Sequence, residues 1–322
     1  MPVARYLTRD NVLALAQMLD VEACLARVLV DTERQSAGHA VRLELAPPGL
    51  PGVLALMPAF KSGANPALAA KVVSVFPANV KKGVPSHQGI AVLFDGEDGG
   101  IAGMVEAGAL TEIRTAALTA LATRTLARPG AARALFVGGG RQLLPHVQAL
   151  SKIPSVTSLA LWVRRTEAAT SVAQELQAAG FDVEIETDLE RAIAAADIIT
   201  TLTSAAEPVI GKSWLKPGAH LNAIGSSTHG VREFDADIAF ACDLFVDDDV
   251  SVKQLAGEFR GLSEYPSMTS LGSVLAGTAS GRRDSKAITV FKSVGIGSMD
   301  LAAMQGLLAL ASSADVGQRL NI

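Results

Sequence analysis

The pattern of hydrophobic and polar positions changes character about a third of the way along the chain. From residue 134 onward, short apolar runs alternate with helix-like stretches, and these runs cover residues 134–137, 158–163, 182–186, 198–201, 220–224, 244–246 and 287–291. This alternation predicts an α/β domain with a doubly wound, mostly parallel sheet that helices cover on both faces.

The part before residue 134 has a different texture. Residues 11–36 carry apolar side chains near helical spacing, which predicts one helix or two. Three strand-like runs follow at 41–45, 52–58 and 70–76, and the runs at 89–95 and 101–105 flank a turn rich in glycine and acidic residues, as in a hairpin. We therefore expect a smaller mixed α+β domain with a largely antiparallel sheet.

Two helical stretches connect these parts. The stretch 110–126 is expected to cross between the domains, and the apolar helix 301–311, with no parallel strand after it, is expected to return to the first domain. The predicted domains are therefore residues 1–115 with 295–322, and residues 116–294.

A glycine-rich turn opens the second domain. The strand-like run 134–137 ends at Gly138, Gly139, Gly140, Arg141 and Gln142, and a helix-like stretch follows to residue 152. Backbone without side chains lets a pyrophosphate approach closely, and a helix start favours its negative charge. Glycine is also common at such junctions for backbone reasons alone, but the strand before and the helix after favour a Rossmann-type dinucleotide site.

The end of the second strand bears on the choice of dinucleotide. The run 158–163 ends in Arg164, Arg165 and Thr166, where an adenosine ribose would lie. Two arginines suit a 2′-phosphate, so we expect NADPH, with NADH as a weaker alternative; a solvated strand end is the competing interpretation. Thr203 and Ser204 follow the run 198–201 and are assigned to the cofactor or, alternatively, to loop capping.

Three cations in the first domain lie where apolar neighbours predict a hydrophobic residue. They are Arg42, Lys71 and Arg114. A cation in such a place costs desolvation energy unless an anion neutralises it, and few acidic residues lie in these segments. We expect a carboxylate or phosphate from outside the protein to do so. The alternative is that the charged ends reach water while the stems are buried.

Composition excludes several classes of protein. The 322 residues are 49% hydrophobic and 19% charged, with net charge −4 and scattered basic residues, so neither a nucleic-acid surface nor a membrane surface is expected. We find no signal peptide or membrane span, which favours the cytoplasm. Cys24 and Cys242 are expected to be buried reduced thiols. Consecutive acids at residues 247–249 are expected to be solvated, and no metal is predicted.

Four motifs together carry a resemblance to a known family. Residues 57–59 (Met-Pro-Ala), 110–117 (Leu-Thr-Glu-Ile-Arg-Thr-Ala-Ala), 138–142 and 290–295 (Val-Phe-Lys-Ser-Val-Gly) resemble the ornithine cyclodeaminase/mu-crystallin family, in the expected order over almost the whole chain. The resemblance implies a homodimer built through the first domain. It also implies that Arg42, Lys71 and Arg114 hold the substrate carboxylate and polarise its imine or amine. To the cofactor we further assign Ser86, Arg114, Thr115, Ile224, Gly225 and Val294.

One departure from the family pattern bears on the chemistry. Cyclodeaminases of this family carry an aspartate where this chain has Ser227, and the usual proline two residues later is His229. A serine cannot replace a carboxylate as base or counter-ion. Branches with a small residue here are similar to ketimine reductases, which pass hydride from NADPH to a cyclic imino acid.

The candidate catalytic residues are Lys71, Ser227 and His87. Lys71 is the preferred residue to hydrogen-bond the carboxylate or relay a proton, since a buried lysine can have a lowered pKa. His87 is a candidate acid, although a packed or surface histidine is the favoured explanation. Arg42 and Arg114 would hold the carboxylate so that the imine carbon faces the nicotinamide.

The sequence thus predicts an NADPH-dependent reductase of Δ1-pyrroline-2-carboxylate, with Δ1-piperideine-2-carboxylate as a second substrate. A cyclodeaminase or a related amino-acid dehydrogenase is one alternative. A non-catalytic ligand-binding protein like mu-crystallin is another.

Overall fold

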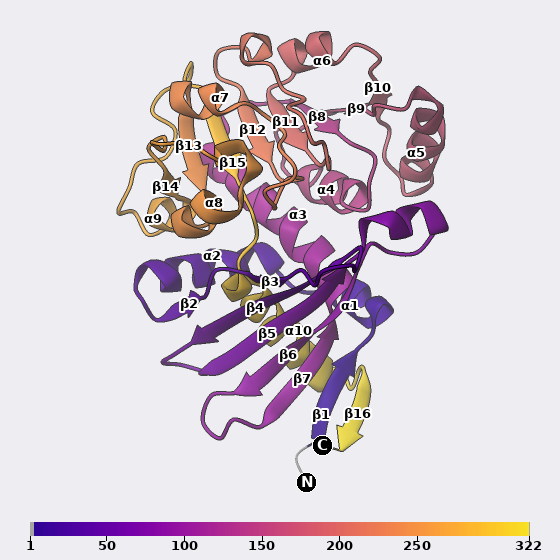
Figure 1. Ribbon diagram of the computed structural model, residues 1–322, viewed down its shortest axis with the longest axis vertical. Helices are drawn as coiled ribbons and strands as arrows, with labels where there is room; N and C mark the ends of the chain where they lie inside the picture. The colour runs from indigo at the N-terminus through magenta and orange to yellow at the C-terminus, as the bar shows by residue number, and fades with distance from the viewer. Residues whose placement is uncertain (1–2, 322) are drawn as a thin grey trace. The chain divides into compact units, whose positions relative to one another are not determined.

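The structure, a computed structural model, describes residues 3–321, apart from the side chains of residues 3, 80, 81 and 166. The chain forms two compact units, Met1–Thr115 with Ile296–Ile322, and Ala116–Gly295. Figure 1 shows their elements, and each unit is described by itself.

The second unit is built on a parallel sheet in the order β10-β9-β8-β11-β12-β15-β13-β14. Its strands are β8 (Arg133–Val137), β9 (Ser158–Trp162), β10 (Glu184–Ile185), β11 (Ile198–Thr201), β12 (His220–Ala223), β13 (Asp243–Val246), β14 (Thr269–Ser270) and β15 (Thr289–Lys292). The strand order reverses between β8 and β11, and such a reversal leaves a crevice at the carboxyl ends of the strands.

Helices connect these strands, as parallel pairing requires. They are α4 (Leu143–Leu150), α5 (Thr166–Ala178), α6 (Leu189–Ala195), α7 (Ala236–Ala241), α8 (Asp249–Leu255) and α9 (Leu271–Leu275). Strands β11, β12 and β15 are buried at every position, which is typical of a sheet covered on both faces.

The first unit is built on a mixed sheet in the order β16-β1-β7-β6-β5-β4-β2, and β3 also pairs with β4. Its strands are β1 (Val3–Leu7), β2 (Ala37–His39), β3 (Leu43–Leu45), β4 (Val53–Lys61), β5 (Ala67–Val75), β6 (His87–Asp95), β7 (Ile101–Glu106) and β16 (Gln318–Asn321). Only β1 and β7 pair in parallel among these described strands.

The inner face of this sheet is covered by the long helix α10 (Gly297–Ser313), which contacts β4, β5 and β6 as well as α1 (Arg9–Ala16) and α2 (Val21–Glu33). The outer face is apolar yet uncovered. The side chains that define it are 43% to 61% exposed and are Leu43, Leu45, Leu54, Phe60 and Leu68. Exposed apolar side chains grouped in this way are typical of surfaces that bind another molecule.

The predicted fold class is confirmed, and so is the hairpin, which β6 and β7 form. The stretch 11–36 proves to be two helices, because Asp20 caps the second of them at its start. The helix expected at 110–126 is α3 (Ala107–Leu126) and begins three residues earlier, where Glu106 accepts hydrogen bonds from the amides of Gly108 and Ala109. Pattern analysis missed β1, β2, β14 and β16, which have two to five residues each.

Candidate active site

Lys71 occupies a core position in β5. Side chains alternate between the two faces of a strand, and every second residue of β5 from Ala67 to Val73 is buried. Its neighbours across the sheet, Met57 and Ala91, carry no charge. Because the Lys71 side chain is only 3% exposed, its ammonium group needs a partner from the helices that cover the sheet.

That partner is Asp300, in the first turn of α10. Its Oδ2 lies 2.8 Å from Lys71 Nζ, and its Oδ1 lies 3.1 Å from Nε of Arg114 in α3. Asp300 and Arg114 are 1% and 5% exposed. Thr111, one helical turn before Arg114, accepts a hydrogen bond from Lys71 Nζ at 3.4 Å. Lys71, Arg114 and Asp300 form a buried triad with one net positive charge.

The start of α10 lies unusually close to the sheet. A Cβ atom at Gly297 would meet the backbone oxygens of Pro58 and Met57 at 2.8 and 3.1 Å. Only glycine permits this approach. It brings Asp300, one turn later, within reach of the cations.

The charges around Lys71 set its ionisation. Burial lowers its pKa; Asp300 opposes this effect, whereas Arg114 and Arg42 add to it, and the pKa is about 8. Near neutral pH this side chain is an ammonium that gives up its proton within an accessible range, as a proton donor requires.

Arg42 lies before β3, and its Nε donates to Glu44 Oε1 at 2.9 Å. Its side chain is 9% exposed. The expectation that these cations lack protein acids is therefore wrong. Asp300 was missed because it is distant in sequence from Lys71 and Arg114. Glu44 lies only two positions after Arg42 along the chain and was overlooked as its partner.

Ser86 and His87 lie at the start of β6. Ser86 is half-buried and His87 is exposed, and Ser86 Oγ lies 3.0 Å from His87 Nδ1. Thr115 follows Arg114 in α3 and is buried. The described contacts do not bring Ser86 or His87 into the triad, so their roles remain predictions.

In the second unit the glycine turn closes β8 at the reversal of strand order. Gly138 has φ +120°, and a Cβ there would lie 2.9 Å from the Leu202 oxygen; a Cβ at Gly139 would lie 2.9 Å from Val163 Cγ1. Gly140 faces open space. Gly138 and Gly139 thus require bare backbone, and the open position at Gly140 beside α4 fits a pyrophosphate.

Arginines surround this turn. Arg141 is exposed next to the glycines, and Gln142 immediately precedes α4 without capping it through its side chain. Arg164 and Arg165 are exposed at the end of β9 and form no ion pair with any side chain that the structure describes. The side chain of Thr166 lies outside the described residues. Two unpaired guanidinium groups here fit an anionic ligand.

Buried acids organise the carboxyl ends of the neighbouring strands. Glu233 accepts hydrogen bonds from the amide and hydroxyl of Thr203 at 2.7 and 2.8 Å, from Thr201 Oγ1 at 2.7 Å and from the Gly225 amide at 2.8 Å. A Cβ at Gly225 would meet Thr203 backbone atoms at 2.2 Å. Burial raises the pKa of Glu233, whereas Lys292 and these hydrogen bonds lower it. Thr203 thus caps a loop through Glu233, while Ser204 is exposed and Ile224 is buried.

The loop that carries Ser227 is held in place by two buried charged residues, Lys292 and Glu258. Lys292, fully buried at the end of β15, donates to the backbone oxygen and the hydroxyl of Ser226 at 2.6 Å each, and pairs with Glu258 at 3.3 Å. The Ser226 hydroxyl also donates to Glu258. Ser227 itself is half-buried. The arrangement fixes the backbone next to Ser227 without using its side chain.

The expectation that residues 247–249 are solvated is wrong for Asp247. It is 4% exposed and accepts hydrogen bonds from Ser293 Oγ and from the amides of Val294 and Gly295 at 2.7, 3.1 and 2.7 Å. Asp247 therefore holds the turn that carries Val294. Its pKa is raised by burial. The two acids after it remain at the surface, where Asp248 caps α8 and Asp249 pairs with Lys253.

The expectation for the thiols holds only for Cys24. Both cysteines are free, but Cys242 is half-buried, and partial burial raises its pKa to about 11. No cluster of potential metal ligands occurs among the described side chains. No helix in the described part of the chain is long and apolar enough to span a membrane.

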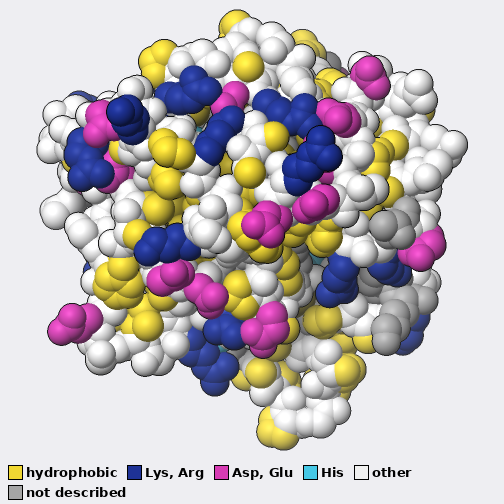
Figure 2. Space-filling model, turned by 90° about the horizontal axis from the view of Figure 1, so that it is seen from above, with side chains coloured by type: hydrophobic (Ala, Val, Ile, Leu, Met, Phe, Trp, Pro, Cys, Tyr) yellow, Lys and Arg dark blue, Asp and Glu magenta, His cyan; other side chains and the backbone are white. Residues whose placement is uncertain are grey.

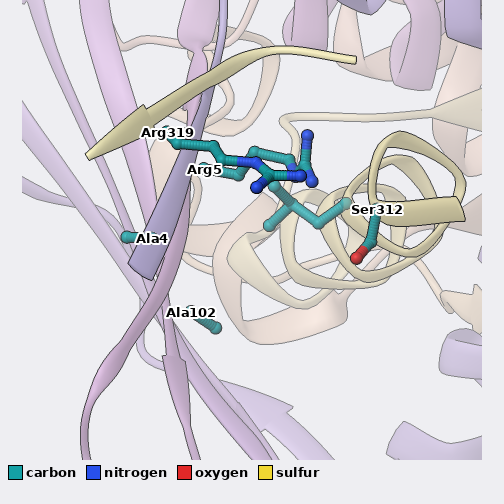
Figure 3. Close-up of a pocket in the computed structure, with 6 residues that line it drawn as sticks. Ala4, Arg5, Ala102, Ser312 and Arg319 are labelled. Atoms are coloured by element: carbon teal, nitrogen blue, oxygen red, sulfur yellow. The ribbon is translucent and has the colours of Figure 1, made fainter. Parts of the chain in front are cut away.

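One cavity of about 250 Å³ lies elsewhere in the first unit. It is lined by Ala4, Arg5, Ala102, Leu308, Ser312 and Arg319 (Figure 3). Both arginines contact Asp315. Figure 2 shows a face on which Lys and Arg side chains lie beside Asp and Glu side chains. Neither the cavity nor this face contains a buried group of cations that is only partly neutralised by an acid, as the triad is.

Comparison with known proteins agrees with the motifs. The mouse ketimine reductase mu-crystallin is 34% identical over 252 residues, which cover 78% of each chain. The Δ1-pyrroline-2-carboxylate reductase of Bacillus cereus (strain ZK / E33L) is 31% identical and covers 95% of this chain and 96% of its own. Among solved structures, the Thermococcus litoralis Δ1-pyrroline-2-carboxylate reductase with NADH and L-proline superposes with a TM-score of 0.91 at 26% identity, over 99% of this chain and 100% of that one.

The family pattern itself extends over residues 5–313 and so includes every candidate residue discussed above. On this match, and on the two relatives named above, which are both more than 30% identical, the chain belongs to the ornithine cyclodeaminase/mu-crystallin family.

Proposed function

We propose that the chain reduces Δ1-pyrroline-2-carboxylate to L-proline with NADPH, and accepts the six-membered Δ1-piperideine-2-carboxylate as well. The observation that carries the proposal is the buried triad of Lys71, Arg114 and Asp300, whose single net positive charge matches one substrate carboxylate. The relatives named above support the reaction class. The chain is an oxidoreductase of the kind that acts on C=N or CH–NH bonds with a nicotinamide cofactor.

The cofactor supplies hydride to the imine carbon when it is bound. The glycine turn, with the open position at Gly140, would hold the pyrophosphate. Arg164 and Arg165 would hold a 2′-phosphate, since two exposed guanidinium groups without ion-pair partners among the described residues suit that group. The Thermococcus relative was solved with NADH, so the preference for NADPH rests on these two arginines.

The chain's own residues bind and orient the imino acid. Arg114 engages Asp300 through Nε, so its two Nη groups are not used in that ion pair and would receive the substrate carboxylate together with Arg42. A cyclic imine is electrophilic at carbon when its nitrogen carries a proton. The Lys71 ammonium would hold a proton at that nitrogen, so that hydride at carbon and a proton at nitrogen complete the amine.

Ring closure with loss of ammonia is the competing reaction. It needs a carboxylate where this chain has Ser227. The nearby acids Glu233 and Glu258 are buried and engaged with the backbone and with Lys292. A serine cannot supply the missing negative charge for a second ammonium group, which favours reduction.

We also propose that the chain is a homodimer through the outer face of the first unit's sheet. Phe60 and Leu68 lie opposite each other on β4 and β5 and are 43% and 53% exposed. Burying such a face against a second copy removes it from water.

The deciding experiment follows NADPH oxidation at 340 nm with each cyclic imine, beside an ammonia-release assay on L-ornithine. Oxidation without ammonia release is the expected result. Lys71→Ala should lose most of the turnover while it still binds NADPH. Release of ammonia and proline from ornithine would replace the proposal with cyclodeamination, and inactivity in both assays would favour a ligand-binding protein.

A further inference from the structure

We propose that Asp300 is a positioning residue that keeps Lys71 protonated and turns Arg114 toward the substrate, although it does not itself touch the substrate. The inference rests on the proposed imine reduction for its kinetic consequence, but its electrostatic part does not. Sequence patterns gave no indication of Asp300, since it lies at the start of an apolar helix.

The first argument is geometric. One carboxylate engages two cations through different oxygens, Lys71 Nζ at 2.8 Å and Arg114 Nε at 3.1 Å. A bond to Nε fixes the plane of the guanidinium and leaves its outer edge for a second, two-point contact. Gly297 allows the close approach of α10 that makes this contact.

The second argument is electrostatic. The ionisable groups that act most strongly on Lys71 among the described residues are Asp300 of α10, Arg114 of α3 and Arg42, and of these three Asp300 alone favours the ammonium form. The strands on either side contribute the uncharged Met57 and Ala91. Without the Asp300 charge, burial and two arginines would leave Lys71 neutral at lower pH.

The consequence for turnover has a definite direction. A reductase that needs the Lys71 ammonium loses activity as the pH rises through the pKa of that group, which is about 8. In Asp300→Asn this loss should move to lower pH by about one unit or more. The Michaelis constant for the imino acid should rise together with it, because Arg114 is no longer held.

The test combines kinetics with a direct measurement of ionisation. The pH dependence of imine reduction is recorded for wild type and Asp300→Asn, and the Cε resonance of Lys71 is titrated in protein with 13C-labelled lysine, with Lys71→Arg used for assignment. Asp300→Glu, which keeps the charge, should titrate closer to wild type. The NMR titration does not need an active enzyme, so a wild-type protein that reduces neither imine would refute the proposed function, while the titration would still decide the electrostatic part of this inference.

Glu112→Gln is the matched control. Glu112 is also a buried carboxylate, but it lies in α3, two residues before Arg114. It accepts hydrogen bonds from both terminal nitrogens of Arg9 at 3.0 and 2.6 Å. Its loss should lower stability without moving the Lys71 titration. If Asp300→Asn does not fold, Asp300→Ser, which also removes the carboxylate, serves instead, and the Lys71 titration should again move to lower pH. An unchanged titration of Lys71 in Asp300→Asn, or in Asp300→Ser where that variant takes its place, would overturn the inference.

Discussion

The arginine pair at the end of β9 offers a direct test of cofactor choice. Arg164 and Arg165 are exposed, and neither forms an ion pair with a described side chain. Replacing both with alanine removes two guanidinium contacts that only a 2′-phosphate could use. NADPH and NADH are otherwise identical, so the difference between their affinities isolates this group.

The size of the effect follows from the exposure of the two arginines. A hydrogen bond to a charged group contributes about 1.5–3 kcal/mol, and solvent screening at an exposed site reduces this to about 1 kcal/mol for each arginine. The sum of about 2 kcal/mol corresponds to a dissociation constant for NADPH that is about 30-fold higher. The affinity for NADH should stay within about twofold, since it lacks the phosphate.

The assay is a fluorescence titration of both nucleotides at two salt concentrations. In wild type, added salt should weaken NADPH binding more than NADH binding. Lys152→Ala with Lys286→Ala is the control, because both lysines are exposed and precede the amino ends of β9 and β15, away from the glycine turn. An equal loss of both nucleotides, or no loss of either, would refute the assignment of the arginines to a 2′-phosphate.

Three further predictions concern stability and assembly. Glu258→Gln leaves the fully buried Lys292 without its carboxylate and should lower the free energy of unfolding by about 3–5 kcal/mol in urea titrations. Glu207→Gln, which breaks a surface pair with Arg232, should leave the free energy of unfolding nearly unchanged. Phe60→Glu with Leu68→Glu should convert a dimer to a monomer in size-exclusion chromatography with light scattering, and a monomeric wild type would contradict the proposed interface. Asp197 has a pKa well below its usual range, because hydrogen bonds from Lys216, from the Ala132 and Arg133 amides and from Arg128 outweigh the opposing effect of burial. Its stabilisation is therefore present above the ordinary carboxyl pKa of 3.8 and is lost as the pH falls below it, so the melting temperatures of wild type and Asp197→Asn should converge in acid.

The parallel sheet was predictable because its strands are short, largely apolar runs that alternate with helix-like stretches. Strand β11 covers the residues expected, and β12, β13 and β15 differ from expectation by one or two residues at an end. Strands β1 and β16 could not be found in this way, since their pairing with each other joins the two ends of the chain. Such pairing depends on contacts that no local window contains.

In the candidate site, too, some residues could be predicted from the local sequence and others could not. Lys71 and Arg114 were conspicuous because each is a cation among apolar neighbours. Asp300, which pairs with both, was hidden because it lies more than 180 positions from Arg114 in the first turn of an apolar helix. The buried acids Glu233, Glu258 and Asp247 were missed for a related reason, since an acid in a loop is ordinarily solvated and only tertiary contacts bury it. Lys292, a cation at the end of a mostly apolar strand, was a local indication that a buried acid, which proved to be Glu258, lies nearby.

The way the first unit combines both ends of the chain has a consequence for its synthesis. The second unit is one uninterrupted stretch, Ala116–Gly295, whereas the first needs α10 and β16 from the last part of the chain. During translation the middle of the protein is therefore free to fold while its beginning still lacks the helix that covers its sheet. Until Asp300 leaves the ribosome, Lys71 has no counter-charge, so a truncated product would combine a folded nucleotide domain with an unfinished sheet prone to associate with other chains.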